Sequence, residues 1–185
     1  MMRKTELAVL ALWAGLFARA ASAITGTTSV QATFISTIEA GTCMAQIQDA
    51  AGRQISTLAF GDVFKSDLTA KSRSEPFGIA FTDCAGVKSA TVQAQKGPGG
   101  GCSGGSRDGD SFAAGNATAF EIWQGIAGAG TLLSCNNPTN QNVIISSGAG
   151  RLDLAARIVI AHGRAIEDVT TGNVSAPVTF VVTYQ

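Results

Sequence analysis

Hydrophobic and polar residues alternate along many short segments of this chain, most clearly near the C-terminus. The hydrophobic side chains of residues 176–185 fall at every second position: Val178, Phe180, Val182 and Tyr184. Successive side chains of a strand point to opposite faces, so these four residues form one row on one face. The β-branched and aromatic content also favours a strand. We expect one edge of this strand to have no partner within the sequence, and we expect that edge to be tied to function.

The same alternation predicts further short strands upstream. They cover residues 30–38, 44–47, 55–60, 75–84, 90–95, 119–125, 131–135, 143–145 and 152–161. Residues 97–110 and 163–172 have the composition of loops, and residues 63–74 are expected to hold a helical turn. Short alternating strands separated by turn signals roughly every 8–12 residues indicate an all-β sandwich.

The N-terminal residues have the features of a secretory signal peptide. A basic start at Arg3 and Lys4 is followed by an apolar run from Leu7 to Phe17, and Ala21-Ser22-Ala23 is a small-x-small cleavage site. The alternative is a membrane anchor, but the apolar run is shorter than the roughly 20 residues that a spanning helix needs. We therefore assign residues 1–23 to a signal peptide and expect export.

The charge balance and the cysteines further limit the class of protein that this chain can be. The 185 residues carry 13 basic and 13 acidic side chains, without the basic excess typical of nucleic-acid binding. Four cysteines follow the signal peptide: Cys43, Cys84, Cys102 and Cys135. An even number in an exported chain predicts disulfides, and three pairings are possible. A zinc site is not expected, because there is no Cys-x-x-Cys motif and only one histidine.

Three segments together resemble a known family, the pilus subunits of the chaperone–usher pathway (type 1-like pilins). They are Gly41-Thr42-Cys43 after an alternating N-terminal arm, residues 77–84 (Phe-Gly-Ile-Ala-Phe-Thr-Asp-Cys), and residues 177–185 with a penultimate Tyr184. The resemblance covers the whole mature chain and points to a minor or adaptor subunit. It implies an incomplete immunoglobulin-like β-sandwich that lacks its last strand. It also implies a Cys43–Cys84 disulfide, which leaves Cys102 and Cys135 for a second pair that is not general in the family.

The resemblance implies a function for the edge of the last strand. The missing strand would leave a hydrophobic groove beside Val178, Phe180, Val182, Tyr184 and Gln185. In the family a periplasmic chaperone fills this groove first, and the N-terminal arm of the next subunit replaces it by β-strand addition at the outer-membrane usher.

The same resemblance divides the chain into a signal peptide (1–23), a donor arm (24–39) and a pilin domain (40–185). The anchors of the arm would be Val30, Ala32 and Phe34, with Ala32 or Gly26 as the small residue where exchange with the chaperone begins. The implied partners are the chaperone, the usher and neighbouring pilus subunits. The implied location is a fimbrium at the bacterial surface, and the implied role in adhesion needs no cofactor or catalysis.

Three other features of the sequence could indicate a different function. Residues 101–105 match the G-x-S-x-G motif, so Ser103, Asp153 and His162 could form the triad of a periplasmic serine hydrolase. That motif should join a strand to a helix, whereas here it lies in a glycine-rich loop. Asp108 and Asp110 could contact calcium but lack further ligands, and Trp123 is expected in the core or between the sheets rather than as a sugar platform.

Two non-enzymatic alternatives also stay open. A tip adhesin would usually carry an extra receptor-binding domain and no donor arm, whereas this chain has an arm and room for one domain. A free-standing exported sandwich that binds a small ligand would fold to a stable monomer by itself.

Overall fold

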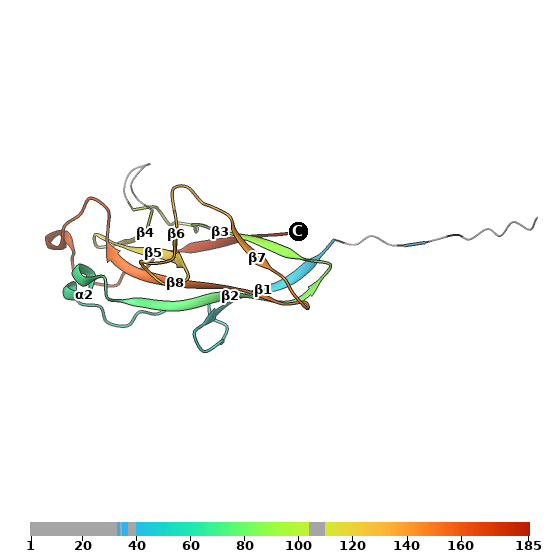
Figure 1. Ribbon diagram of the computed structural model, residues 1–185. Coiled ribbons are helices and arrows are strands. Elements are labelled where there is room, and N and C mark those ends of the chain that lie inside the picture. Colours follow the sequence, from blue (N-terminus) through green and yellow to red (C-terminus); the bar gives the residue numbers. More distant parts are fainter. Residues whose placement is uncertain (1–32, 34, 37–39, 104–109) are drawn as a thin grey trace, which may run out of the picture. The chain divides into compact units, whose positions relative to one another are not determined.

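The computed structural model describes residues 33, 35–36, 40–103 and 110–185 (Figure 1). The chain separates into residues 1–37 and 38–185, and the helices and strands of the described residues belong to the second unit. The strands are β1 (Thr42–Asp49), β2 (Ser74–Ala85), β3 (Ser89–Lys96), β4 (Phe112–Gly115), β5 (Thr118–Gln124), β6 (Thr131–Leu133), β7 (Gln141–Ile144), β8 (Gly150–Ile160) and β9 (Val178–Tyr184). Two short helices, α2 (Lys65–Ala70) and the 3-10 helix η1 (Ile166–Asp168), complete the unit.

The strands form two antiparallel sheets, which Figure 1 shows as two layers. The large sheet has the order β1-β2-β8-β5-β4, with β6 also paired to β5. The small sheet has the order β7-β3-β9, so β9 is an edge strand. The sandwich predicted from the alternation is therefore confirmed.

The core lies between the sheets because one side chain in two points inward from each strand. The inward-facing residues of both sheets form one cluster that includes Phe77, Ile79, Phe81, Val92, Phe112, Ile122, Leu133, Val143, Leu152 and Leu154. A second, smaller cluster joins α2 to the end of β8 through Leu68, Ile158 and Val169. Phe60 packs against both clusters.

The helical turn expected within residues 63–74 is α2. It begins where the backbone N–H of Phe64 donates a hydrogen bond of 3.0 Å to Oδ2 of Asp67, which satisfies one of the free donors at a helix start. It ends at Lys71, which has a left-handed backbone with φ 53°. In the described part of the chain, no helix has the length and apolar character needed to cross a membrane.

One predicted strand is wrong. Residues 55–60 make no regular strand, and the only bridge nearby joins Gln54 to Gln48. Alternation selects strand-forming residues, but a strand also needs a hydrogen-bonding partner. Within the described chain, residues 56–60 have none on the backbone.

Two disulfides hold the sandwich. Cys43 is bonded to Cys84 and links β1 to β2, and Cys102 is bonded to Cys135. These are the two pairs that the family resemblance implies. The second pair ties the loop before β4 to the residues that follow β6.

Candidate functional site

The outer edge of β9 is open. At the end of the strand, Gln185 and Ser89 of the neighbouring strand β3 exchange backbone hydrogen bonds of 2.8 and 3.2 Å. Hydrogen-bonded pairs alternate with non-bonded pairs in an antiparallel ladder, so Thr183, Val181 and Thr179 also bond toward β3. The backbone groups of the alternate residues point to the other edge: Val178, Phe180, Val182 and Tyr184. Among the described residues, no strand pairs with that edge.

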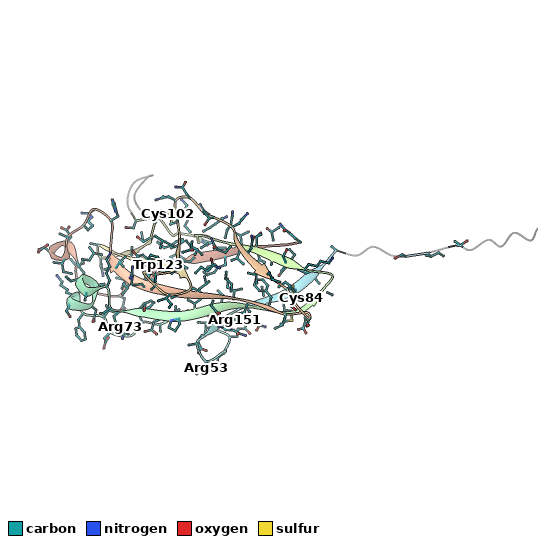
Figure 2. All side chains as sticks on the ribbon, viewed as in Figure 1. Arg53, Arg73, Cys84, Cys102, Trp123 and Arg151 are labelled. Carbon is teal, nitrogen blue, oxygen red and sulfur yellow. A yellow bond between two sulfur atoms is a disulfide. The ribbon has the colours of Figure 1, made fainter. Side chains whose placement is uncertain are left out.

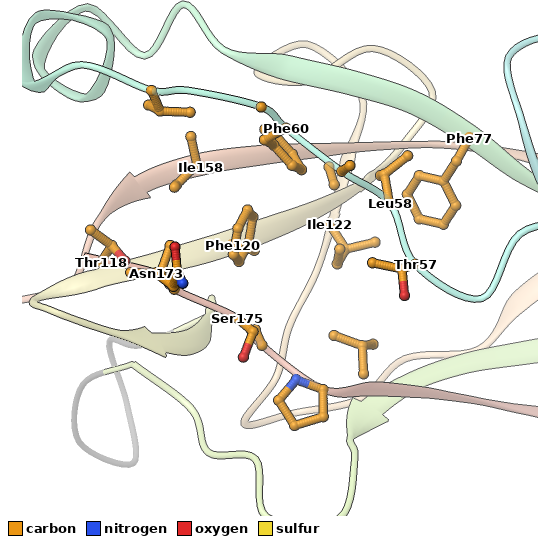
Figure 3. Close-up of a pocket in the computed structure, with 18 of the residues that line it drawn as sticks. Thr57, Leu58, Phe60, Phe77, Thr118, Phe120, Ile122, Ile158, Asn173 and Ser175 are labelled. Carbon is orange, nitrogen blue, oxygen red and sulfur yellow. The ribbon is translucent and has the colours of Figure 1, made fainter. Parts of the chain in front are cut away.

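A cavity of about 1200 Å³ lies beside the first half of β9 (Figure 3). We call this cavity the groove. One side consists of residues 169–180, the other side consists of residues 55–65, and side chains of the large sheet, including Phe77, Phe120 and Ile122, also line it. Asp62 and Lys65 are the only charged residues in its lining. The groove is therefore apolar and borders the unpaired backbone edge of β9.

The predicted groove residues of β9 divide into two sets. Val178 and Phe180 line the groove, and the Phe180 ring lies 6.0 Å from the Phe77 ring. Val182 and Tyr184 lie outside the groove lining and pack against the core cluster. All four side chains contact the core cluster, but only those at 178 and 180 also border the open cavity.

Tyr184 and Gln185 close the far end of the strand. The Tyr184 ring packs edge-on against Phe81 at 6.5 Å, and its hydroxyl donates a hydrogen bond of 3.1 Å to the Cys43 carbonyl. Gln185 bonds to Ser89 and so faces β3 rather than the free edge. The side chains of Tyr184 and Gln185 thus lie outside the lining of this cavity, and their assignment to the strand that receives a partner stays a prediction.

The side of the groove opposite β9 is formed in part by residues 55–60, which we call the wall segment. Its first residue, Ile55, donates a backbone hydrogen bond of 2.9 Å to the Ile47 carbonyl of β1. Leu58 and Phe60 pack against the core, and the Phe60 ring lies 4.9 Å from the Phe120 ring. The sequence pattern predicts a strand here and does not single out these two residues. The irregular residues 56–60 and the unpaired edge of β9 thus border one apolar space.

Sequence reasoning missed the other part of the lining. The sequence predicts a loop up to residue 172 and a strand from residue 176. In the structure, residues 169–177 together form one side of the groove. The available signal was weak. It consisted of Val169, Val174 and Ala176 spaced among small polar residues, without the strict alternation of a strand.

The predicted anchors of the donor arm, Val30, Ala32 and Phe34, lie outside the described residues. Of the neighbouring positions, Thr33, Ile35 and Ser36 are described and exposed, and the side chain of Ile35 is 91% exposed. The assignment of residues 24–39 to a donor arm stays a prediction.

The serine, aspartate and histidine of the hydrolase hypothesis do not form a triad. Ser103 is buried, and its Oγ accepts a hydrogen bond of 2.7 Å from the backbone N–H of His162. Asp153 instead pairs with Arg151 at 2.6 Å. The strand continues for seven residues from Asp153 to Ile160, a length of roughly 23 Å. Asp153 therefore lies far from the other two residues.

Trp123 is placed differently from the expectation. Alternation along β5 buries Ile122 between the sheets and turns Trp123 to the outer face of the large sheet. There Arg157 lies 5.2 Å from the ring centre, and Nε1 donates a hydrogen bond of 3.0 Å to Glu121. Because Glu121 also binds Arg157 at 2.6 Å, the indole belongs to a local charged network rather than to the core.

Within the part of the chain that the structure describes, the fold brings no further calcium ligands close to Asp110. Asp108 lies outside the described residues, and Asp110 accepts a hydrogen bond of 2.5 Å from the Ser134 hydroxyl. Among the described residues, no three acidic, histidine or cysteine side chains are grouped closely enough to hold a metal ion.

Comparison with known proteins gives one related sequence and several related folds. No family model matches the chain. The uncharacterized fimbrial-like protein YadL of Escherichia coli K12 is 36% identical over 171 residues, which cover 85% of each chain. The P pilus rod subunit PapA is 25% identical and has a TM-score of 0.52, covering 77% of this chain and 99% of its own. A subunit from a chaperone–usher pilus studied for rod uncoiling shares the fold, with 22% identity, a TM-score of 0.54, and coverage of 86% and 98%.

Proposed function

We propose a specific task for this chain, which belongs to the family of fimbrial (pilus) subunits: its groove receives a β-strand from a neighbouring subunit. The chain is a structural subunit of a pilus, and the inserted strand would be the joint between successive subunits. The observation that carries the proposal is the unpaired edge of β9 beside an apolar cavity of about 1200 Å³.

Two physical properties of the edge support strand insertion. An exposed edge with free N–H and C=O groups is a template for pairing with another chain, and proteins normally cover it. An added strand would supply the missing partners of Val178, Phe180, Val182 and Tyr184, while its alternate side chains would fill the groove. One inserted segment would thus supply hydrogen-bond partners for the free backbone groups and cover the apolar surface of the groove.

The donor that we propose is the arm of a neighbouring subunit, residues 24–39. Val30, Ala32 and Phe34 fall at every second position, which gives one face of an extended segment the side chains to enter the groove. Burying Phe34 should contribute about 1.5–3 kcal/mol, because a phenyl ring leaves water. A periplasmic chaperone would cover the groove before assembly, and an outer-membrane usher would host the exchange, so the route runs through the periplasm to a fimbrium that supports adhesion.

The test is capture of the arm as a peptide. The exported chain, unfolded in urea and diluted into buffer, should refold to a stable complex when a synthetic peptide of residues 24–39 is present in excess. The control peptide carries Phe34→Asp, which would bring a charge into an apolar space and should bind weakly. A chain that refolds to a stable monomer without any peptide, and that binds neither peptide, would show that the domain is complete and that the proposal is wrong.

A further inference from the structure

The wall segment is held at few points. Residues 56–60 make no backbone–backbone hydrogen bonds within the described chain, and Ile55 is fixed by one bond to Ile47. An apolar groove that is open to water favours closing, because closing removes apolar surface from water. Leu58 and Phe60 pack against the core, and a contact at the far end of the segment would add to the restraint that keeps residues 56–60 apart from β9.

Arg73 makes the contact that holds the other end of this segment. It stands just before β2, near α2 in Figure 2, and its Nη2 donates a hydrogen bond to the backbone carbonyl of Phe60. The same nitrogen lies 3.4 Å from the Glu75 carboxylate. The donor is charged and the acceptor is partly buried, and charge-assisted bonds of this kind are stronger than neutral ones.

The position of Arg73 leaves one of its own donors without a partner among the described residues. The Nε of Arg73 is buried, and no group in the described chain accepts its hydrogen. A buried donor without a partner is unfavourable, most of all on a charged group. The guanidinium is thus placed where it reaches Phe60 even though one of its own donors stays unsatisfied.

Phe60 connects the Arg73 contact to the groove, because Phe60 itself lines the groove. Its ring packs on Phe120, which lines the groove, and it belongs to the edges of both core clusters. Phe60 is thus held at two points, its carbonyl by Arg73 and its ring by Phe120. Losing the first would leave the backbone of the wall segment free to rotate about Phe60.

We propose that Arg73 is a positioning residue of the groove, whose guanidinium holds Phe60 and the wall segment in the open arrangement that accepts an inserted strand. The inference rests on the proposed function and adds the residue that prepares its site. Without Arg73, the Phe60 carbonyl would be free to turn into the groove, the wall segment would move toward β9, and an incoming strand would have to displace it.

The experiment measures capture of a fluorescent peptide of residues 24–39 by the exported chain and by four variants of it. Arg73→Gln removes the charged donor, and Arg73→Lys keeps the charge but replaces the planar fork by a single ammonium group. Glu75→Gln removes the ion pair while leaving the bond to Phe60. Arg53→Gln is a matched control, because Arg53 is exposed and pairs with Asp49 in the turn after β1.

We expect Arg73→Gln to lower the affinity for the peptide by about tenfold or more. We expect a smaller loss in Arg73→Lys and almost no loss in Glu75→Gln or Arg53→Gln. Backbone NMR of the peptide complexes supplies the second readout. A positioning role predicts shifted amide signals confined to residues 56–61 in Arg73→Gln, whereas a general loss of stability would lower the urea midpoint of the whole sandwich without such local shifts.

The outcomes separate the two claims. If the wild-type chain does not capture the peptide, the proposed function fails and this inference fails with it. If the wild-type chain captures the peptide and both Arg73 variants capture it equally well, only the inference fails. If Arg73→Gln does not fold, Arg73→Lys decides: weaker capture with shifted amide signals confined to 56–61 supports the role of Arg73, and unchanged capture, or weaker capture without local shifts, overturns it.

Discussion

The hydroxyl of Tyr184 donates a hydrogen bond of 3.1 Å to the backbone carbonyl of Cys43. This contact joins the end of β9 to the start of β1, two strands that belong to different sheets. Cys43 is itself fixed to Cys84 of β2 by a disulfide. The two sheets are therefore tied together at this end of β9, while the groove separates β9 from the wall segment at the other end.

Replacing Tyr184 tests how much this tie contributes. Tyr184→Phe removes the hydroxyl and keeps the ring against Phe81, so the free energy of unfolding should fall by about 1 kcal/mol. Tyr184→Ala also removes the ring contact and should cost about 2–4 kcal/mol. Urea unfolding of each variant in complex with the arm peptide gives both values. Equal losses in the two variants would mean that the ring contributes nothing.

Removing the disulfides should destabilise the sandwich strongly. The bonded residues are 41 positions apart in Cys43–Cys84 and 33 apart in Cys102–Cys135. In the chain-entropy description, closing loops of this length stabilises by about 4 kcal/mol for each bond. We expect Cys43→Ala/Cys84→Ala and Cys102→Ala/Cys135→Ala to lose similar amounts in urea unfolding. Peptide mapping of the wild-type chain without reductant checks the premise, and free thiols at any of the four positions would contradict it.

Charges placed on the arm and on β9 should have different effects. Phe34→Asp changes the proposed donor arm, so it should leave the fold and chaperone binding of its own subunit intact and block insertion into the neighbour. Val182→Asp puts a carboxylate among partly buried core contacts, where desolvation is unfavourable, and should impair folding and chaperone capture. Both variants are co-expressed with the chaperone, and the periplasmic complex is isolated and assayed for strand exchange.

Either of two results would contradict the donor-arm assignment. In the first, Phe34→Asp loses the chaperone complex, which would place Phe34 inside the domain of its own subunit. In the second, both variants polymerise as the wild type does, which would mean that neither position takes part in the joint.

Ser103→Ala should affect stability and not catalysis. Ser103 is 3% exposed, and its Oγ accepts the backbone N–H of His162. Without the hydroxyl this donor loses its partner, and the free energy of unfolding should fall by about 1–3 kcal/mol. Urea unfolding measures the loss, and a chromogenic ester assay of both proteins tests the alternative. Esterase activity in the wild type that disappears in Ser103→Ala would revive the hydrolase hypothesis.

The sequence predicted the sandwich because strand periodicity depends on each segment and its two faces. Residues 75–84, 152–161 and 176–185 show that alternation plainly, and they correspond to β2, β8 and β9. Residues 55–60 show it too, yet they form no strand. Alternation reports which side chains face inward, whereas a ladder depends on what lies at the edge.

The groove could be predicted only in part. The sequence predicts Val178 and Phe180 as groove residues because they lie on a regular strand. The opposite side consists of irregular chain, and the path of that chain depends on contacts between distant residues, such as Arg73 with Phe60. Trp123 was misplaced for a similar reason. Its size favoured the core, but the register of β5 against β8, which pairs Trp123 with Ala155, turns it outward.

The direction of β9 bears on how such a fibre would resist tension. The unpaired backbone groups of Val178, Phe180, Val182 and Tyr184 form a row along the strand, and an inserted arm would bond to all of them in parallel. A pull along the strand axis would load these bonds in shear, so that they must fail together. A pull across the strand would peel them one at a time. With the arm in the groove, subunits would resist stretching of the fibre far better than prying of one domain from the next, without any covalent link between them.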